Sequence, residues 1–142
     1  MRLPDVNILV NALRPDAPDH ERCRTWLEGT VNDPRPFALA GEVLSGAIRI
    51  LTHPRVFDPP SDRRAVVDQL DRLLAAPNAV VIRPGPRHWR LFSRLLESAD
   101  ARGNLVPDAW LAAIAIEHGC TFVTLDQDYA RFGDLEWTGP DR

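Results

Sequence analysis

Four acidic residues stand where a carboxylate could take part in chemistry: Asp5, Glu42, Asp108 and Asp126. Asp5 and Asp126 each follow a short apolar run typical of a strand, whereas Glu42 and Asp108 each open an apolar segment with helical character. Taken singly, each acid has an ordinary explanation as a turn residue or a first-turn helix residue. Taken together, they place a carboxylate at each of four strand ends or helix starts.

The segment from Asp108 to Asp126 indicates how such acids are positioned. Residues 109–116, AWLAAIAI, are apolar on every side, which predicts a helix buried inside the domain. Gly119 ends this helix, and the β-branched run CTFVTL that follows is typical of a strand covered on both faces. A carboxylate at the head of a buried helix is costly unless something compensates its charge.

The rest of the chain alternates between strands and helices. Strands are expected at 1–5, 35–40, 78–84 and, as a short edge strand, 135–139; helices are expected at 6–13, 16–31, 43–51, 63–77 and 86–103. In the last of these helices Trp89 is expected to face inward and the arginines outward. The alternation predicts an α/β fold of three layers, α/β/α, with a mainly parallel central sheet in one domain spanning 1–142. In such sheets function gathers at the carboxyl ends of the strands.

Composition narrows the classes of function. A net charge of −3 argues against a generic polyanion binder, so any contact with nucleic acid has to be local. No apolar run approaches the ~20 residues of a membrane span. The two cysteines, Cys23 and Cys120, lack metal-ligand spacing and are expected to be reduced core residues, which suits a cytoplasmic protein.

Four converging carboxylates require a cation or a proton. Two carboxylates about 5 Å apart repel by roughly 3 kcal/mol at an effective dielectric near 20. Oxygen ligands without histidine or cysteine select Mg²⁺, with Mn²⁺ as a substitute. We expect Asp5 and Asp108 to bind the metal, and Glu42 and Asp126 to bind it directly or through water. A metal so held supports phosphodiester hydrolysis.

Three polar residues beside the acids are candidates for supporting roles. Asn7, Asn104 and Thr124 could orient the carboxylates or contact phosphate. Each also has a structural interpretation, as an early helix residue, a turn or cap residue and a strand former respectively. Asp128 is a fifth acid for which a turn role and a ligand role both stay open.

The order of the motifs resembles a known family. DVNILV, then GEVLSGAIRILTHPRVF, then ARGNLVPDAWLAAIAIEHGCTFVTLDQDYARF is similar to PIN-domain ribonucleases, specifically VapC-type toxins, over essentially the whole chain. The resemblance implies a PIN-like fold and a Mg²⁺-dependent endoribonuclease that cleaves RNA and is neutralised by a small VapB-like antitoxin. It assigns the family's acids to Asp5, Glu42, Asp108 and Asp126. Gln127 stands where an arginine is commoner, which leaves the choice of RNA open.

Two predicted helices indicate how the protein binds other protein chains. The segments 19–29 and 61–76 carry more apolar residues than one small sheet needs, which predicts a homodimer and a hydrophobic groove for the antitoxin.

Two other functions stay open at this stage. One is a catalytically inactive PIN module that binds RNA or a protein partner and uses its acids structurally. The other is an aspartate-dependent phosphatase, because TLDQD after a strand fits an Asp-x-Asp nucleophile motif. Such phosphoryl-transfer families normally rely on a lysine, and this sequence has none.

Overall fold

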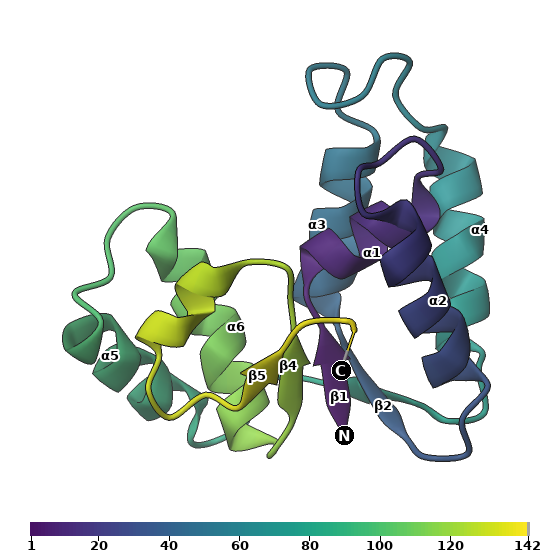
Figure 1. Ribbon diagram of the computed structural model, residues 1–142. Coiled ribbons are helices and arrows are strands. Elements are labelled where there is room, and N and C mark those ends of the chain that lie inside the picture. Colours follow the sequence, from purple (N-terminus) through teal and green to yellow (C-terminus); the bar gives the residue numbers. More distant parts are fainter. Residues whose placement is uncertain (142) are drawn as a thin grey trace.

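Short parallel strands form the centre of the molecule in the computed structural model, which describes residues 1–141 (Figure 1). The strands are β1 (Arg2–Pro4), β2 (Phe37–Ala40), β3 (Ala79–Ile82), β4 (Thr121–Val123) and β5 (Trp137–Thr138). Parallel ladders join β1 to β4, β4 to β5, and β2 to β3, and β2 lies beside β1. The strands therefore follow the order β3-β2-β1-β4-β5.

Pro4 accounts for the break between the two ladders. The backbone N–H of Asp5 donates to the carbonyl of Val123 on β4 at 2.8 Å. Because successive residues of a strand point their backbone groups to opposite sides, the nitrogen of Pro4 faces β2, and proline has no N–H to donate. In the described range, β1 and β2 pack side by side without a ladder.

Helices cover both faces of the strands and complete three layers (Figure 1). They are α1 (Val6–Leu13), α2 (His20–Val31), α3 (Gly41–Leu51), α4 (Arg63–Leu74), α5 (His88–Ser98) and α6 (Leu105–Glu117). The first four pack together on one side, and α5 packs against α6 on the other. The chain steps from β1 to β3 in one direction and then returns to β4, so right-handed crossovers place α5 and α6 on the opposite face. The predicted three-layer α/β/α fold is confirmed.

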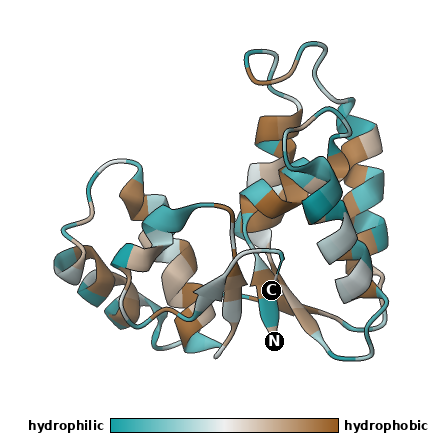
Figure 2. Ribbon diagram, in the orientation of Figure 1, coloured by the Kyte–Doolittle hydropathy of each residue, from teal (hydrophilic) through white to brown (hydrophobic). Residues whose placement is uncertain are grey.

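Helix α6 lies within the core, as its composition predicts. From Ala109 to Ala115 every residue is buried except Trp110, and Figure 2 shows hydrophobic residues gathered where the layers meet. Cys23 and Cys120 are buried and free, as expected. No helix in residues 1–141 has the length and apolarity needed to cross a bilayer.

One orientation predicted from the sequence is wrong. Trp89 of α5 does not face inward, because 68% of its surface is exposed. The helix is shorter than predicted and buries a stripe formed by His88, Phe92 and Leu95. Trp89 lies on the edge of that stripe, and the hydrophobic spacing alone does not distinguish the edge from the centre.

Asn78 fastens the loop between α2 and β2 to the start of β3. Its side-chain amide donates to the carbonyls of Thr30, Asp33 and Arg35, at 3.0, 2.6 and 3.1 Å. One amide group thus serves three backbone carbonyls. Replacing Asn78 by a residue whose side chain has no N–H group removes the side-chain donor from all three carbonyls at once.

We predict that Asn78→Asp destabilises the fold more than Asn78→Ala at neutral pH. The alanine variant loses hydrogen bonds, which costs about 1–3 kcal/mol, whereas the aspartate adds a charge that faces three carbonyl oxygens. Protonation restores a donor, so the aspartate variant should recover relative to alanine below about pH 4. Denaturant unfolding measures both effects, with Asn32→Asp as the control. Equal stability of the two Asn78 variants at neutral pH would contradict this role.

Candidate functional site

The strand order reverses at β1, and the candidate site lies there. The connection from β1 leads to β2 on one side, whereas β4 lies on the other side, so the loops that leave β1 and β4 diverge and open a crevice at the carboxyl ends. A cleft of about 670 Å³ occupies this position. Its lining includes all four predicted acids: Asp5, Glu42, Asp108 and Asp126.

Asp5 lies at the bottom of the cleft and is tied to both strands. Its Oδ1 accepts the backbone N–H of Val6 at 2.7 Å, so Asp5 caps α1. Its Oδ2 accepts the Thr124 hydroxyl at 2.7 Å and the Asn7 amide at 3.0 Å. Asn7 Oδ1 in turn accepts the backbone N–H of Leu125 at 3.1 Å. The network holds the ends of β1 and β4 at a fixed separation.

Burial dominates the electrostatics of Asp5. The residue is only 5% exposed, and this desolvation is the main cause that raises the pKa of Asp5 to about 6. The bonds from Thr124 and Val6 oppose the rise in that pKa, and the charges of Asp108 and Asp126 add to it. Three of the predicted acids therefore lie close enough to repel one another.

Asp108 is held from the other side of the cleft. It lies in the first turn of α6, and the hydroxyl of the buried Tyr129 donates to its Oδ1 at 3.2 Å. Partial burial, followed by the charges of Asp126 and Asp128, raises the pKa of Asp108. Burial and the same cluster of acids raise the pKa of Tyr129, so its hydroxyl stays a donor at neutral pH.

Asp126 follows β4 and caps the short 3₁₀ helix Gln127–Arg131. Its Oδ1 accepts the backbone N–H of Asp128 at 2.9 Å, and its own N–H donates to the Thr124 hydroxyl at 3.0 Å. Thr124 thus contacts both Asp5 and Asp126, and its hydroxyl is the meeting point of the two strand ends.

Glu42 stands apart from the other three acids. It lies in the first turn of α3 and is exposed on the wall of the cleft. The indole N–H of Trp110 donates to its Oε2 at 2.7 Å. Trp110 is fixed in turn by buried His88, whose ring lies 4.2 Å away, centroid to centroid. Glu42 is therefore oriented by a tryptophan rather than by the other carboxylates.

The structure brings most of the predicted site residues together. The four acids and Asn7 line the cleft, and Thr124 bonds to two of the acids. Asn104 does not join them: it is exposed at the N-cap of α6 and caps no backbone group with its side chain.

Two residues that contact the acids were not predicted as site residues. Trp110 was expected only as part of the buried apolar segment 109–116, and Tyr129 was not singled out, although each lies two or three residues beyond an acid. That spacing is the signal in the sequence that could have identified them.

The donor set suits a hard divalent cation. Carboxylates converge on the cleft, and neither histidine nor cysteine is among the described residues that line it. In the side-chain positions described for residues 1–141, no three acidic, histidine or cysteine side chains are grouped closely enough to hold one ion. The bond from Trp110 holds the Glu42 carboxylate against the cleft wall, apart from the other three acids.

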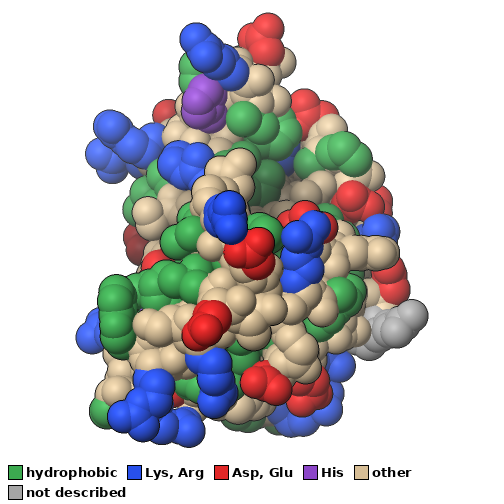
Figure 3. All heavy atoms as spheres, turned by 90° about the vertical axis from the view of Figure 1, so that its left-hand side faces the viewer, with side chains coloured by type: hydrophobic (Ala, Val, Ile, Leu, Met, Phe, Trp, Pro, Cys, Tyr) green, Lys and Arg blue, Asp and Glu red, His purple; other side chains and the backbone are tan. Residues whose placement is uncertain are grey.

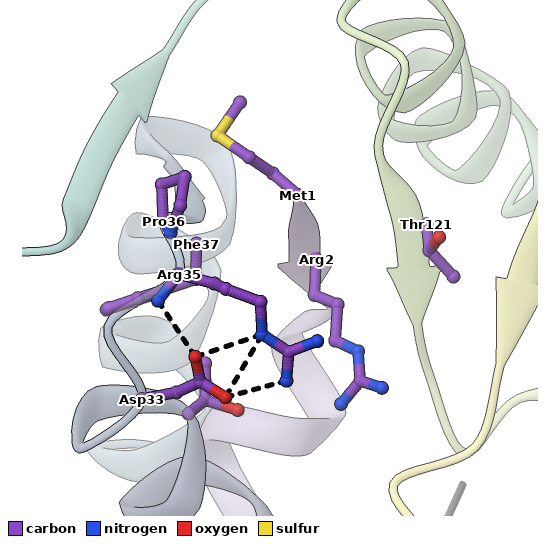
Figure 4. Close-up of a pocket in the computed structure, with 8 residues that line it drawn as sticks. Met1, Arg2, Asp33, Arg35, Pro36, Phe37 and Thr121 are labelled. Carbon is purple, nitrogen blue, oxygen red and sulfur yellow. Dashed lines mark hydrogen bonds and ion pairs between the residues drawn. The ribbon is translucent and has the colours of Figure 1, made fainter.

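A second hollow lies at the opposite, amino ends of β1 and β2 (Figure 4). It encloses about 370 Å³ and is lined by Met1, Arg2, Thr30, Asp33, Arg35, Pro36, Phe37 and Thr121. Its one acid, Asp33, is already paired with Arg35, which holds the pKa of Asp33 down at about 2. This hollow has no surplus of negative charge and is a poorer candidate for metal chemistry.

Comparisons with known proteins agree with this geometry. The sequence model of the PIN domain family matches residues 2–135 of this chain. Ribonuclease VapC43 of Mycobacterium tuberculosis is 44% identical over 136 residues, which cover 96% of this chain and 92% of that protein. Ribonuclease VapC25 of the same species is 39% identical and covers 99% of both chains.

A solved structure shows the same fold. The crystal structure of VapBC2 from Rickettsia felis bound to a promoter DNA fragment aligns with a TM-score of 0.71, covering 97% of each chain at 19% identity. The family match extends over nearly the whole chain, and the relatives above 30% identity are VapC ribonucleases. The resemblance seen in the sequence is confirmed: the chain belongs to the PIN-domain family and, within it, to the VapC proteins.

Proposed function

We propose that this protein is a Mg²⁺-dependent endoribonuclease that acts in the cytoplasm as the toxin of a toxin–antitoxin pair. The observation that carries the proposal is the set of four carboxylates lining one cleft at the strand-order reversal. Burial and mutual repulsion raise the pKa of Asp5 and Asp108, so the site is destabilised until positive charge arrives. The names of the relatives, ribonucleases in each case, support RNA as the substrate.

Each acid has a distinct part in this proposal. Asp5 and Asp108 would hold the metal directly, and Asp126 and Glu42 would hold it directly or through water. The bound metal supplies a water of lowered pKa and a positive charge beside the phosphate. Asn7 and Thr124 keep Asp5 in place, and Tyr129 keeps Asp108 in place. Trp110 sets the direction of Glu42 on the cleft wall.

RNA cleavage is expected to require a divalent cation. The purified protein should cut RNA in Mg²⁺ or Mn²⁺ and stop in EDTA, and Ca²⁺ should support cleavage poorly because it organises water weakly. Gel analysis of the RNA measures this, with a phosphomonoester as the alternative substrate. Full RNA cleavage in EDTA would remove the metal from the mechanism. Binding of RNA without cleavage would favour the inactive module, and phosphomonoester hydrolysis alone would favour the phosphatase.

Asp108→Asn should abolish cleavage and raise the melting temperature in metal-free buffer at neutral pH. The amide still accepts a hydrogen bond from Tyr129, so the shape is kept while the repulsion from Asp126 and Asp128 is relieved. We expect a gain of about 1–2 kcal/mol, allowing for solvent screening of this half-buried group. Differential scanning calorimetry measures the gain. Asp71→Asn, an exposed acid on α4, is the control.

The pH dependence of this gain in stability follows from the direction in which the pKa of Asp108 is shifted, which is upward. A carboxyl with a raised folded pKa destabilises the protein once it ionises, so the stability of the metal-free protein falls as the pH rises from about 4. Asp5, whose pKa is about 6, lowers the stability of both the wild-type protein and the Asp108→Asn variant as the pH rises. The advantage of Asp108→Asn should therefore be absent near pH 4 and complete near pH 7. A variant that melts lower at pH 7 and still cuts RNA would refute the site assignment.

A small antitoxin and a second copy of the chain complete the proposed assembly. Solved structures with this fold include VapBC2 of Rickettsia felis and FitAcB of Neisseria gonorrhoeae. Here a hollow of about 310 Å³ lies between α1, α2 and α4, lined by residues such as Leu13, Leu27 and Gln69. On α4, Val67 and Leu74 are 36% and 37% exposed. An amphipathic antitoxin segment could lay its apolar side chains along Val67 and Leu74, which lie outside that hollow on the same helix.

The protein expressed with its native operon should sediment as a homodimer and carry a small partner through purification. Val67→Asp should lower the yield of that partner at least about tenfold, because it places a charge in an apolar contact, and RNA cleavage by the toxin alone should persist. Val56→Asp in an exposed loop is the control. A monomer at micromolar concentration with no co-purifying partner would argue against this assembly.

A further inference from the structure

The outer surface of α5 combines an exposed aromatic ring with positive charge. Trp89 is the most exposed large hydrophobic residue described, at 68%. Arg90 and Arg94 lie on the solvent side of the same helix, one turn apart. We call Trp89, Arg90 and Arg94 the α5 surface. Figure 3 looks onto the α5 and α6 side of the molecule, where hydrophobic side chains reach the surface among arginines.

The charge around this surface differs from that of the whole molecule. Residues 83–96 contain four arginines and no acidic residue, and the acids nearest to the α5 surface are Glu97, one turn beyond Arg94 on the same helix face, and Asp134. No ion pair or side-chain hydrogen bond of Arg90 is present within residues 1–141. Arg94 meets Asp134 only at 3.7 Å, and both side chains are more than 60% exposed, so water screens the pair. Within the described residues, the α5 surface therefore presents two exposed guanidinium groups beside Trp89, and that of Arg90 has no ion pair.

Aromatic packing connects Trp89 to the cleft. The Trp89 ring lies 5.6 Å from Phe92, which lies 5.1 Å from Trp110, between ring centroids. The rings of Trp89 and Trp110 are therefore at most about 11 Å apart. Trp110 lines the cleft and donates to Glu42. A nucleic-acid strand bound at the acids and passing Trp110 would reach Trp89 within roughly three stacked nucleotides, at about 3.4 Å each.

We propose that the α5 surface binds the single-stranded RNA that extends from the cleft. A base stacks on the Trp89 indole, and the neighbouring phosphates meet Arg90 and Arg94. Stacking on an exposed aromatic ring is tolerant of sequence, and guanidinium groups bind phosphate in a bidentate manner. This inference rests on the proposed function, since it takes RNA as the ligand of the cleft.

The side chains of the α5 surface favour RNA over a second copy of the chain. A symmetric contact whose two-fold axis passes through Arg90 and Arg94 would bring like charges together, which is repulsive. A polyanion instead neutralises them, and the exposed indole gains a stacking partner. The acidic cleft needs such help, because phosphates approach it against negative charge.

The test measures binding of a labelled single-stranded RNA of about 12 nucleotides, within the length that such surfaces cover, by fluorescence anisotropy in EDTA. Trp89→Ala should weaken binding about tenfold, and Trp89→Phe should keep most of the affinity because a ring remains. Arg90→Ala and Arg94→Ala should each lower the slope of log affinity against log salt by about 0.7. Arg64→Ala on α4 and Val56→Ala are the matched controls.

Cleavage in Mg²⁺ separates this inference from the proposed function. Trp89→Ala should raise KM for the same RNA and leave kcat unchanged. If the wild-type protein cleaves RNA and Trp89→Ala alters neither KM nor affinity, the α5 surface is refuted while the function stands. If RNA binds through Trp89 but is not cut, the function fails and the surface stands. Loss of dimer or of a co-purifying protein in Trp89→Ala, with RNA affinity intact, would make the surface a protein contact and overturn the inference.

Discussion

The site depends on the hydrogen bonds that the buried carboxylate of Asp5 accepts. Asp5 ends β1, caps α1 through Val6, and receives the Thr124 hydroxyl from the end of β4. Those bonds join two strands that are far apart in the sequence, and they hold a charge where water would otherwise be needed to stabilise it. The ionised group still costs free energy, since burial raises its pKa to about 6. The apolar core, above all the buried helix α6, supplies the stability that makes this cost tolerable.

The fold and the position of the site follow from the sequence because both depend on simple alternation. Apolar runs followed by helical segments predict parallel strands, and parallel strands bring their carboxyl ends to one edge. Asp5 and Asp126 each end such a run, so their convergence needs no long-range information beyond the strand order. Asp108 was placed by the unusual composition of α6. The four acids do line one cleft, although their roles as ligands stay predictions.

The sequence could not predict which way a side chain points around its helix axis, nor the contacts between elements that are distant in the sequence. Trp89 and Phe92 are three residues apart on one helix, yet one is exposed and the other buried, because the buried stripe of α5 runs through His88, Phe92 and Leu95 and leaves Trp89 at its edge. The bond from Trp110 to Glu42 crosses between α6 and α3, and no local pattern encodes it. Asn104 was named for its proximity to Asp108 in sequence, but its side chain is exposed outside the cleft.

The hydrogen bonds of Asp5 also limit how its carboxylate can bind anything else. A carboxylate offers about four lone pairs, two on each oxygen. Oδ2 accepts hydrogen bonds from Asn7 and Thr124, so both of its lone pairs are occupied. Oδ1 accepts one hydrogen bond, from the backbone N–H of Val6, which occupies one of its two lone pairs. One lone pair is left, so a cation bound to Asp5 would meet a single oxygen atom. Ca²⁺ commonly takes both oxygens of a carboxylate, whereas Mg²⁺ needs six single oxygens at octahedral corners and keeps several of them as water. Thr124, which follows β4 and holds Asp5 in place, would thereby also favour the smaller cation by leaving Asp5 one oxygen with which to bind it.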